Sequence, residues 1–123
     1  MTETWDDKSP IYRQLRNRVA RLIMDGSFAE GEAIPSVRQV SSDFKINHLT
    51  VSKAYQALVD AGVLEMRRGR GMFVLSGAQD KLLAESRKNF EENEIPKILD
   101  QAKQLGISKT DLIAKINTHI NDK

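Results

Sequence analysis

A short run between positions 48 and 53 combines side chains that could form hydrogen bonds with another molecule. It contains His48, Leu49, Thr50, Ser52 and Lys53, and it has no carboxylate. If a helix presents these residues together, its surface is short, polar and free of negative charge. Such a surface can enter the major groove of DNA, where hydroxyls and amines reach base edges and a leucine can pack on a thymine methyl. The run therefore favours a recognition helix.

A cationic segment, Arg-Arg-Gly-Arg-Gly, occupies positions 67–71. Apolar runs on both sides of it predict a β-hairpin with the arginines at its tip. Glycine allows positive φ and lets the backbone approach another surface closely, and the arginines place positive charge at the same point. Such a tip suits contact with phosphates or entry into a minor groove. The tip residues expected to make these contacts are Arg68, Gly69 and Arg70.

A buried stripe must hold the recognition helix in place. Asn47 fits its N-cap, because an Asn side chain can accept hydrogen bonds from the free N–H groups of a first helical turn, and Gly62 fits its C-cap. Between them, apolar residues recur at the spacing of one buried helix face. The residues of this stripe are Val51, Ala54, Tyr55, Leu58 and Val59. The residues on the opposite face are Leu49, Ser52, Lys53 and Gln56.

A shorter helix is predicted over positions 36–44, with Ser36 placed to cap it. Its apolar stripe faces inward and leaves Arg38 outside. Only Lys45 and Ile46 separate this helix from the cap of the next one. Two helices with so short a connection match the helix-turn-helix layout, in which the first helix crosses the DNA backbone and the second enters the groove.

Another helix is predicted over positions 10–24, with Ser9 as its cap and Pro10 at the first helical position. Its apolar stripe is expected to pack against the two helices that follow it in the chain. Most of the arginines on its other sides are expected to be solvated. Trp5, just before this helix, is expected to fold back on the core as an apolar anchor.

Three segments in this order, IPSVRQV, INHLTVSKAYQALVDAGVLE and RRGRGMFV, resemble the winged helix-turn-helix of the GntR family of bacterial transcription regulators. The AYQAL step and the short C-terminal tail are similar to its YtrA-like branch. The resemblance covers positions 10–75. It implies a mainly α fold in which three helices and a two-stranded β-hairpin, the wing, bind DNA.

The resemblance also implies that Arg38 holds a phosphate or a base at the edge of the groove. Many family members carry Arg at the positions of His48 and Ser52, so the operator sequence cannot be transferred from relatives. The candidate DNA-binding residues are Ser36, Arg38, His48, Leu49, Thr50, Ser52, Lys53, Arg68, Gly69 and Arg70. Relatives with short tails are often associated with transporter operons, and the protein is expected to repress nearby operons.

Positions 1–75 are predicted to form the DNA-binding domain, and positions 76–123 a short helical tail. Pro96 predicts a break or kink near Asn93, and Ser108 with Asp111 resembles a helix-capping signal. The apolar stripes of the tail need a partner: either the tail folds onto its own winged helix, or it meets the tail of a second chain. The second alternative is favoured, because symmetric DNA readers place two recognition helices on two half-sites of a palindromic operator. The resemblance implies the same homodimer.

The charge distribution agrees with a nucleic-acid partner. The net charge is only +2, but positions 10–75 carry ten Lys and Arg against six Asp and Glu, whereas the tail is balanced. The sequence has no Cys and only two His, and it shows no nucleophile–base pair, glycine-rich phosphate loop or metal-ligand spacing. An enzyme, a metal site and a cofactor are therefore not expected.

Two further expectations concern partners and location. No apolar run is long enough to span a bilayer, and the acidic N-terminus is unlike a signal peptide, so a cytoplasmic protein without a membrane partner is expected. A small-molecule effector remains open, since the tail is too short for a separate effector domain but a dimer interface could hold a cavity. The alternative function is a winged helix that docks proteins without specific DNA binding, although that would favour an acidic or apolar outer face.

Overall fold

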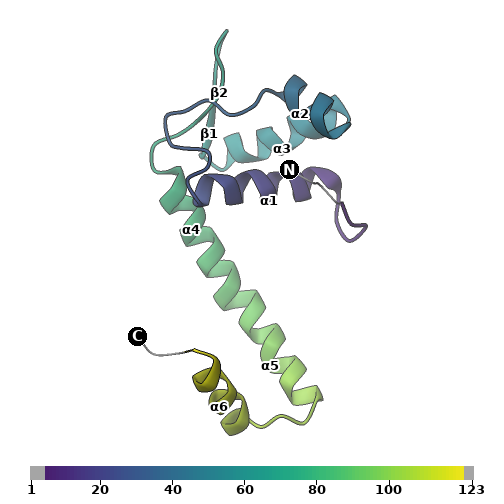
Figure 1. Cartoon of the computed structure of the whole chain (residues 1–123), viewed down its shortest axis with the longest axis vertical. Coiled ribbons are helices and arrows are strands. Elements are labelled where there is room, and N and C mark those ends of the chain that lie inside the picture. Colours follow the sequence, from purple (N-terminus) through teal and green to yellow (C-terminus); the bar gives the residue numbers. More distant parts are fainter. Residues whose placement is uncertain (1–4, 121–123) are drawn as a thin grey trace. The chain divides into compact units, whose positions relative to one another are not determined.

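The computed structural model describes residues 5–120 and consists mainly of helices with one antiparallel hairpin (Figure 1). Two compact units divide the chain, the first ending at Ala84 and the second beginning at Glu85. The elements in chain order are α1 (Ile11–Met24), α2 (Val37–Phe44), α3 (His48–Asp60), β1 (Leu64–Arg67), β2 (Gly71–Val74), α4 (Ala78–Asn89), the π-helix η1 (Phe90–Glu94), α5 (Ile95–Gln104) and α6 (Lys109–His119).

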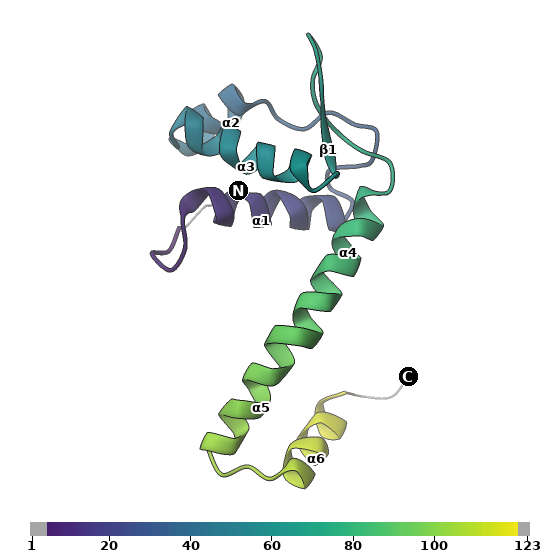
Figure 2. The same cartoon turned by 180° about the vertical axis from the view of Figure 1, so that it is seen from behind.

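The first unit is a winged helix-turn-helix, as the sequence predicted. Helices α1 and α2 both pack against α3, and the hairpin projects beyond the three helices in both views (Figures 1 and 2). The predicted stripe of α3 is buried, with Val51 and Leu58 fully inaccessible and Val59 half-buried. Burial of such side chains is worth about 1.5–3 kcal/mol each, so this stripe fixes which face of α3 remains outside.

The start of α1 differs from the prediction. Pro10 is the N-cap, with an extended ψ of 146° and no side-chain capping bond, and the helix begins at Ile11. Ser9 lies one residue too far out to cap it, so that expectation was wrong. Instead the Gln14 side chain donates a hydrogen bond to the Ser9 carbonyl oxygen at 2.8 Å. Trp5 packs against the core as expected, and the Arg18 guanidinium lies 4.2 Å from its ring centroid.

The helix-turn-helix connection follows the predicted boundaries. Lys45 adopts a left-handed conformation with φ of 53°, and Ile46 is buried beneath the turn. At its other end α3 stops at Asp60 with Ala61 as C-cap, one residue before the predicted Gly62. Gly62 follows at φ of 78°, where a side chain would be strained and its Cβ would lie 2.8 Å from the Lys81 ammonium.

The connector between α1 and α2 braces the wing along β2. The Ile34 N–H donates to the Met72 carbonyl at 2.9 Å, and the Gly31 N–H donates to the Val74 carbonyl at 2.8 Å. Ala33 also forms an antiparallel bridge with Phe73. Because these bonds satisfy an edge of the two-stranded sheet, the position of the wing depends on the connector as well as on its own hairpin.

The first turns of α4 belong to the winged-helix unit. Ala78 is fully buried and Leu82 is 2% exposed. The Glu30 carboxylate accepts hydrogen bonds from the N–H groups of Gly77 and Gln79, each at 3.0 Å, which lowers the pKa of Glu30, the Gly77 bond being the larger cause. The Gln79 side chain donates in turn to the Met24 carbonyl at 2.8 Å. Glu30 therefore caps a helix that begins far along the chain.

The second unit contains helices whose apolar residues remain exposed. Near Asn93, where a break or kink was predicted, the helix does not end, because η1 carries it across this position into α5, and the Ile95 N–H donates to the Phe90 carbonyl. The wider π-turn accommodates Pro96, which lacks an N–H and sits in the first turn of α5. Ser108 caps α6 by accepting from the Asp111 N–H at 3.1 Å, as predicted.

Candidate nucleic-acid interface

The first turn of α3 is organised by Asn47, as the sequence predicted. The Asn47 side-chain oxygen accepts a hydrogen bond from the Leu49 N–H at 2.7 Å. This cap fixes where the helix begins and therefore which residues occupy its outer face. His48, Ser52 and Lys53 are exposed, Thr50 is half-buried, and Leu49 is 77% exposed.

A surface hollow of about 240 Å³ joins α2, α3 and the wing. Its lining includes Ser36 and Arg38 from the start of α2, His48 from the start of α3, and Met66 and Met72 from the two strands. Three of the candidate DNA-binding residues are thus brought together by elements that are separate in the sequence. The sequence did not single out Met66, which is 64% exposed although it is apolar.

The start of α2 is arranged so that its polar groups face outward. The Ser36 hydroxyl oxygen accepts from the Gln39 N–H at 3.0 Å, which caps the helix and leaves the hydroxyl proton available. Arg38 is exposed and forms no ion pair within the part of the chain that the structure describes. Its guanidinium is consequently available to a phosphate or a base edge.

A second hollow, of about 370 Å³, lies on the α1 side of the recognition helix. It brings Leu49, Thr50 and Lys53 of α3 against the first turn of α1, where Tyr12 lies. The Lys53 ammonium is 4.3 Å from the centroid of the Tyr12 ring, which is a cation–π contact. Sequence reasoning missed Tyr12, since only the fold brings it to this surface.

The wing tip is a tight turn stabilised by glycine. The Arg70 N–H donates to the Arg67 carbonyl at 2.8 Å, and Gly69 has φ of 75°, as a type II turn requires at its third position. Arg67 is held by Glu65 at 2.9 Å and lies 4.2 Å from the Phe73 ring centroid. Arg68, Gly69 and Arg70 are exposed, and the Arg70 guanidinium lies 5.3 Å from the Phe73 ring centroid.

The carboxylates near this surface are already engaged. Asp43 accepts both of its hydrogen bonds from the Gln39 amide, at 3.0 and 2.9 Å. The Gln56 amide similarly donates to Asp60 at 2.9 Å. Neither α2 nor α3 has an acidic residue in its first turn. The first turns of both helices therefore present cations and hydroxyls, which suit a polyanion, whereas the exposed carboxylates of Asp43 and Asp60 lie at the far ends of α2 and α3.

Two other kinds of site are absent from the described residues. Positions 5–120 contain no cluster of three or more His, Cys, Asp or Glu residues that could hold a metal ion. Within the same range, no helix is long and apolar enough to cross a membrane.

Comparison with known proteins gives the same interpretation. A family model described as bacterial regulatory proteins, gntR family, matches residues 11–74. The transcriptional repressor YtrA of Bacillus subtilis is 34% identical over 97 residues, which cover 79% of this chain and 68% of that protein. A GntR family transcriptional regulator from Listeria monocytogenes has a similar structure, with a TM-score of 0.77 and 25% identity over 94% of this chain and 100% of that chain.

A DNA-bound structure is also similar. The DNA-binding domain of AraR in complex with an operator matches with a TM-score of 0.53 and 26% identity, over 60% of this chain and 89% of that chain. The family model covers more than half of the present chain, and the relatives share its helix-turn-helix. The chain therefore belongs to the GntR family of bacterial regulatory proteins, as a YtrA-like DNA-binding transcriptional regulator and not an enzyme.

Proposed function

We propose that this regulator is a cytoplasmic homodimeric repressor that binds a palindromic operator through its winged helix. The observation that carries the proposal is the exposed outer face of α3, which bears no acidic residue in its first two turns and lies between the Arg38–His48 hollow and the Tyr12 side of α1. A face of this size and polarity fits the major groove. The wing tip then meets the adjoining groove or backbone.

Each candidate residue has a role that follows from its position. His48, Leu49, Thr50, Ser52 and Lys53 contact base edges, since they line the outer side of α3 or its first turn. Ser36 and Arg38 contact the backbone or a base at the groove edge, and Arg68, Gly69 and Arg70 contact DNA from the wing. The DNA-binding domain of AraR, whose fold is similar, is bound to an operator, which supports DNA binding by the winged helix.

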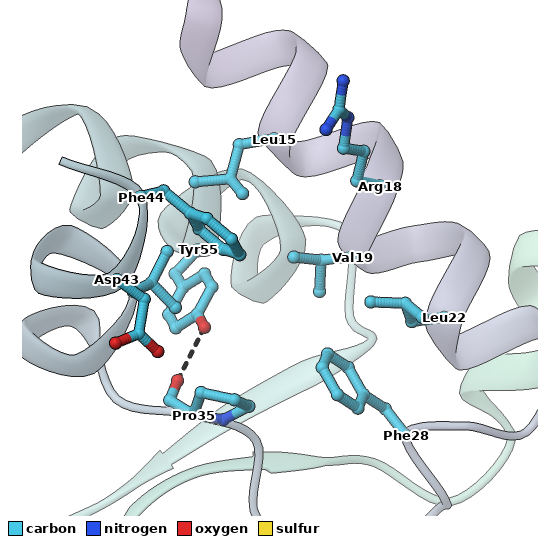
Figure 3. Close-up of a pocket in the computed structure, with 10 residues that line it drawn as sticks. Leu15, Arg18, Val19, Leu22, Phe28, Pro35, Asp43, Phe44 and Tyr55 are labelled. Carbon is cyan, nitrogen blue, oxygen red and sulfur yellow. Dashed lines mark hydrogen bonds between the residues drawn. The ribbon is translucent and has the colours of Figure 1, made fainter. Parts of the chain in front are cut away.

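The sign of regulation is proposed from relatives. The similar protein YtrA is named a transcriptional repressor, and a repressor acts by occupying an operator, which requires no further domain. We propose nearby operons, transporter operons first among them, as targets. A small-molecule effector stays a prediction. The largely apolar cavity drawn in Figure 3, which lies between α1, α2 and α3, has a volume of about 300 Å³, the size of a small ligand pocket.

Positions 1–75 are the proposed DNA-binding domain, and positions 76–123 are the proposed dimerisation tail. The second unit, from Glu85 onward, forms most of this tail and supports a homodimer. Among the described residues from 85 onward only Ala102 is buried. The large apolar residues left at least 37% exposed there are Phe90, Ile95, Ile98, Leu99, Leu105, Ile107, Ile113, Ile116 and Ile120. So many exposed apolar side chains mark an interaction surface, and a second copy would also supply the second recognition helix.

Selection of bound duplexes from random DNA by the full chain tests the proposal. We expect two inverted half-sites whose centres lie about 10–10.5 base pairs apart, or a multiple of that spacing. Recovery of duplexes without any shared sequence would contradict specific operator binding, and would leave the protein-docking alternative. A single half-site without its inverted copy would contradict the symmetric dimer while keeping the recognition face.

Arg38→Ala tests the site on the selected operator. We expect loss of the electrophoretic shift, with an unchanged circular dichroism spectrum because Arg38 is exposed. Where residual binding is measurable, the slope of log K against log salt should fall by about 1 if the lost contact is a phosphate. Arg21→Ala is the matched control, since it removes the same charge from an exposed position late in α1. An unchanged shift for Arg38→Ala would remove Arg38 from the site.

A further inference from the structure

Tyr12 lies between two cations at the edge of the recognition helix. The Lys53 ammonium from α3 is 4.3 Å from the centroid of its ring. Arg13 follows Tyr12 on α1, and a hydrogen bond from Arg13, followed by the charge of Arg13, lowers the pKa of the Tyr12 hydroxyl. The charge of Lys53 lowers that pKa further. One aromatic side chain thus connects a cation from each of two helices.

Neither cation has a carboxylate partner in the part of the chain that the structure describes. Within the described residues, neither Arg13 nor Lys53 forms an ion pair. Both side chains are exposed, so two positive charges act on Tyr12 without an anionic partner among residues 5–120. An anion that binds beside Lys53 and Arg13 would offset the repulsion between their charges. On a DNA-binding surface this anion is a backbone phosphate.

The contact also decides where Lys53 points. A lysine side chain has many rotamers, and a free one on the outer face of α3 could reach toward bases or phosphates. The Tyr12 ring instead holds the ammonium on the α1 side of that face, in the hollow that also contains Leu49 and Thr50. This direction leads away from the hollow on the other side, where Arg38 and His48 lie beside the wing.

We infer that Tyr12 is a positioning residue of the DNA interface, whose ring holds Lys53 so that Lys53 and Arg13 together bind backbone phosphates of one DNA strand. The inference rests on the proposed function and refines it, since it assigns Lys53 to the backbone and leaves base reading to His48 and its neighbours. Arg13 is the arginine of α1 that this inference assigns to DNA, because it follows Tyr12 in the chain and is exposed.

A double-mutant cycle on the full chain tests the inference, with fluorescence anisotropy on the selected operator and on a scrambled duplex. Tyr12→Leu should weaken operator binding about two- to fivefold, the range of an exposed cation–π contact. In a Lys53→Met background the same change should have no effect. Tyr12→Phe, which keeps the ring over which Lys53 lies, should retain most of the affinity lost in Tyr12→Leu.

The salt dependence separates the two roles of Lys53. Lys53→Met should lower the slope of log K against log salt by about 1 and should weaken both duplexes by the same factor. An equal effect of Tyr12→Leu in both backgrounds would overturn the positioning role. A change of base preference in Lys53→Met would overturn the phosphate role. Either result leaves the proposed function intact, provided that the unmodified chain prefers its operator over the scrambled duplex. If the unmodified chain shows no such preference, both the proposed function and this inference are wrong.

Discussion

Tyr55 shows how a single residue ties the recognition helix to the segment that leads into α2. Its ring is buried, and its hydroxyl donates to the Pro35 carbonyl at 2.6 Å on one side of the cavity drawn in Figure 3. Burial raises the pKa of the Tyr55 hydroxyl, so the group stays a neutral donor at physiological pH. The bond therefore fixes the backbone immediately before Ser36 against the centre of α3.

Tyr55→Phe should lower the free energy of unfolding by about 0.5–1.5 kcal/mol, because it removes this hydrogen bond and keeps the ring. Urea unfolding followed by circular dichroism measures the change. Tyr12→Phe removes the same group from a half-exposed ring and serves as the control. Equal stability of Tyr55→Phe and the unmodified chain would show that water replaces the hydroxyl at Pro35 without loss.

Residue types and spacing predicted the outer face of α3, because the helical period assigns Leu49, Ser52 and Lys53 to the side opposite the buried stripe. They could not predict Tyr12, since its contact with Lys53 depends on how α1 packs on α3. Ser9 failed for another reason. The sequence signal does not decide which of the adjacent residues Ser9 and Pro10 is the N-cap. Pro10 has an extended ψ and is the N-cap, so the helix begins one position later than predicted.

At the scale of elements, Glu30 joins the connector to the start of α4. Its pKa is lowered by the N–H groups of Gly77 and Gln79, so folding favours the charged carboxylate. The stabilisation is therefore present above the ordinary carboxyl pKa, about 4.3, and is lost as the pH falls through the lowered value. Acidification should therefore loosen the start of α4 only below about pH 4.

Thermal unfolding between about pH 3 and 7 tests this coupling. Glu30→Gln should lower Tm by a few degrees at neutral pH, and the difference from the unmodified chain should shrink toward pH 3. Glu32→Gln, which removes the same charge from the same exposed connector, is the control and should show no such trend. A difference that stays constant with pH would mean that the carboxylate charge of Glu30 contributes nothing to the bond.

The sequence correctly predicted the helix starts that are capped by the side chain of the residue next to the helix in the chain. Ser36, Asn47 and Ser108 each bond an N–H within three residues, and each was identified from its own neighbourhood. The cap of α4 escaped prediction, because Glu30 is 47 residues from Gly77. The π-helix was not predicted either. Pro96 shows that a regular α-helix cannot continue through this position, but it does not show whether the helix ends or widens into a π-turn.

At the scale of the whole molecule, the exposed apolar residues of the second unit are the basis of the proposed dimer. Ile113 and Ile116 of α6 are each 47% exposed, and no residue of α6 is buried. The sequence predicted these stripes and left two partners open, because periodicity identifies an apolar face without showing what covers it. Under the proposed dimer, contact with the partner chain stabilises this exposed helix more than its own packing does.

Ile116→Asp should dissociate the proposed dimer, because it places a charge in an apolar contact where it would be desolvated. Light scattering coupled to size exclusion should then report the mass of one chain instead of two. Operator affinity should fall by at least about 100-fold, since two linked recognition helices gain that much over independent ones. Lys115→Asp puts the same charge on the neighbouring exposed position of α6 and should leave both values close to those of the unmodified chain. If the unmodified chain itself has the mass of one chain at micromolar concentration and still binds an inverted repeat tightly, the tail covers its own winged helix and the symmetric dimer is wrong.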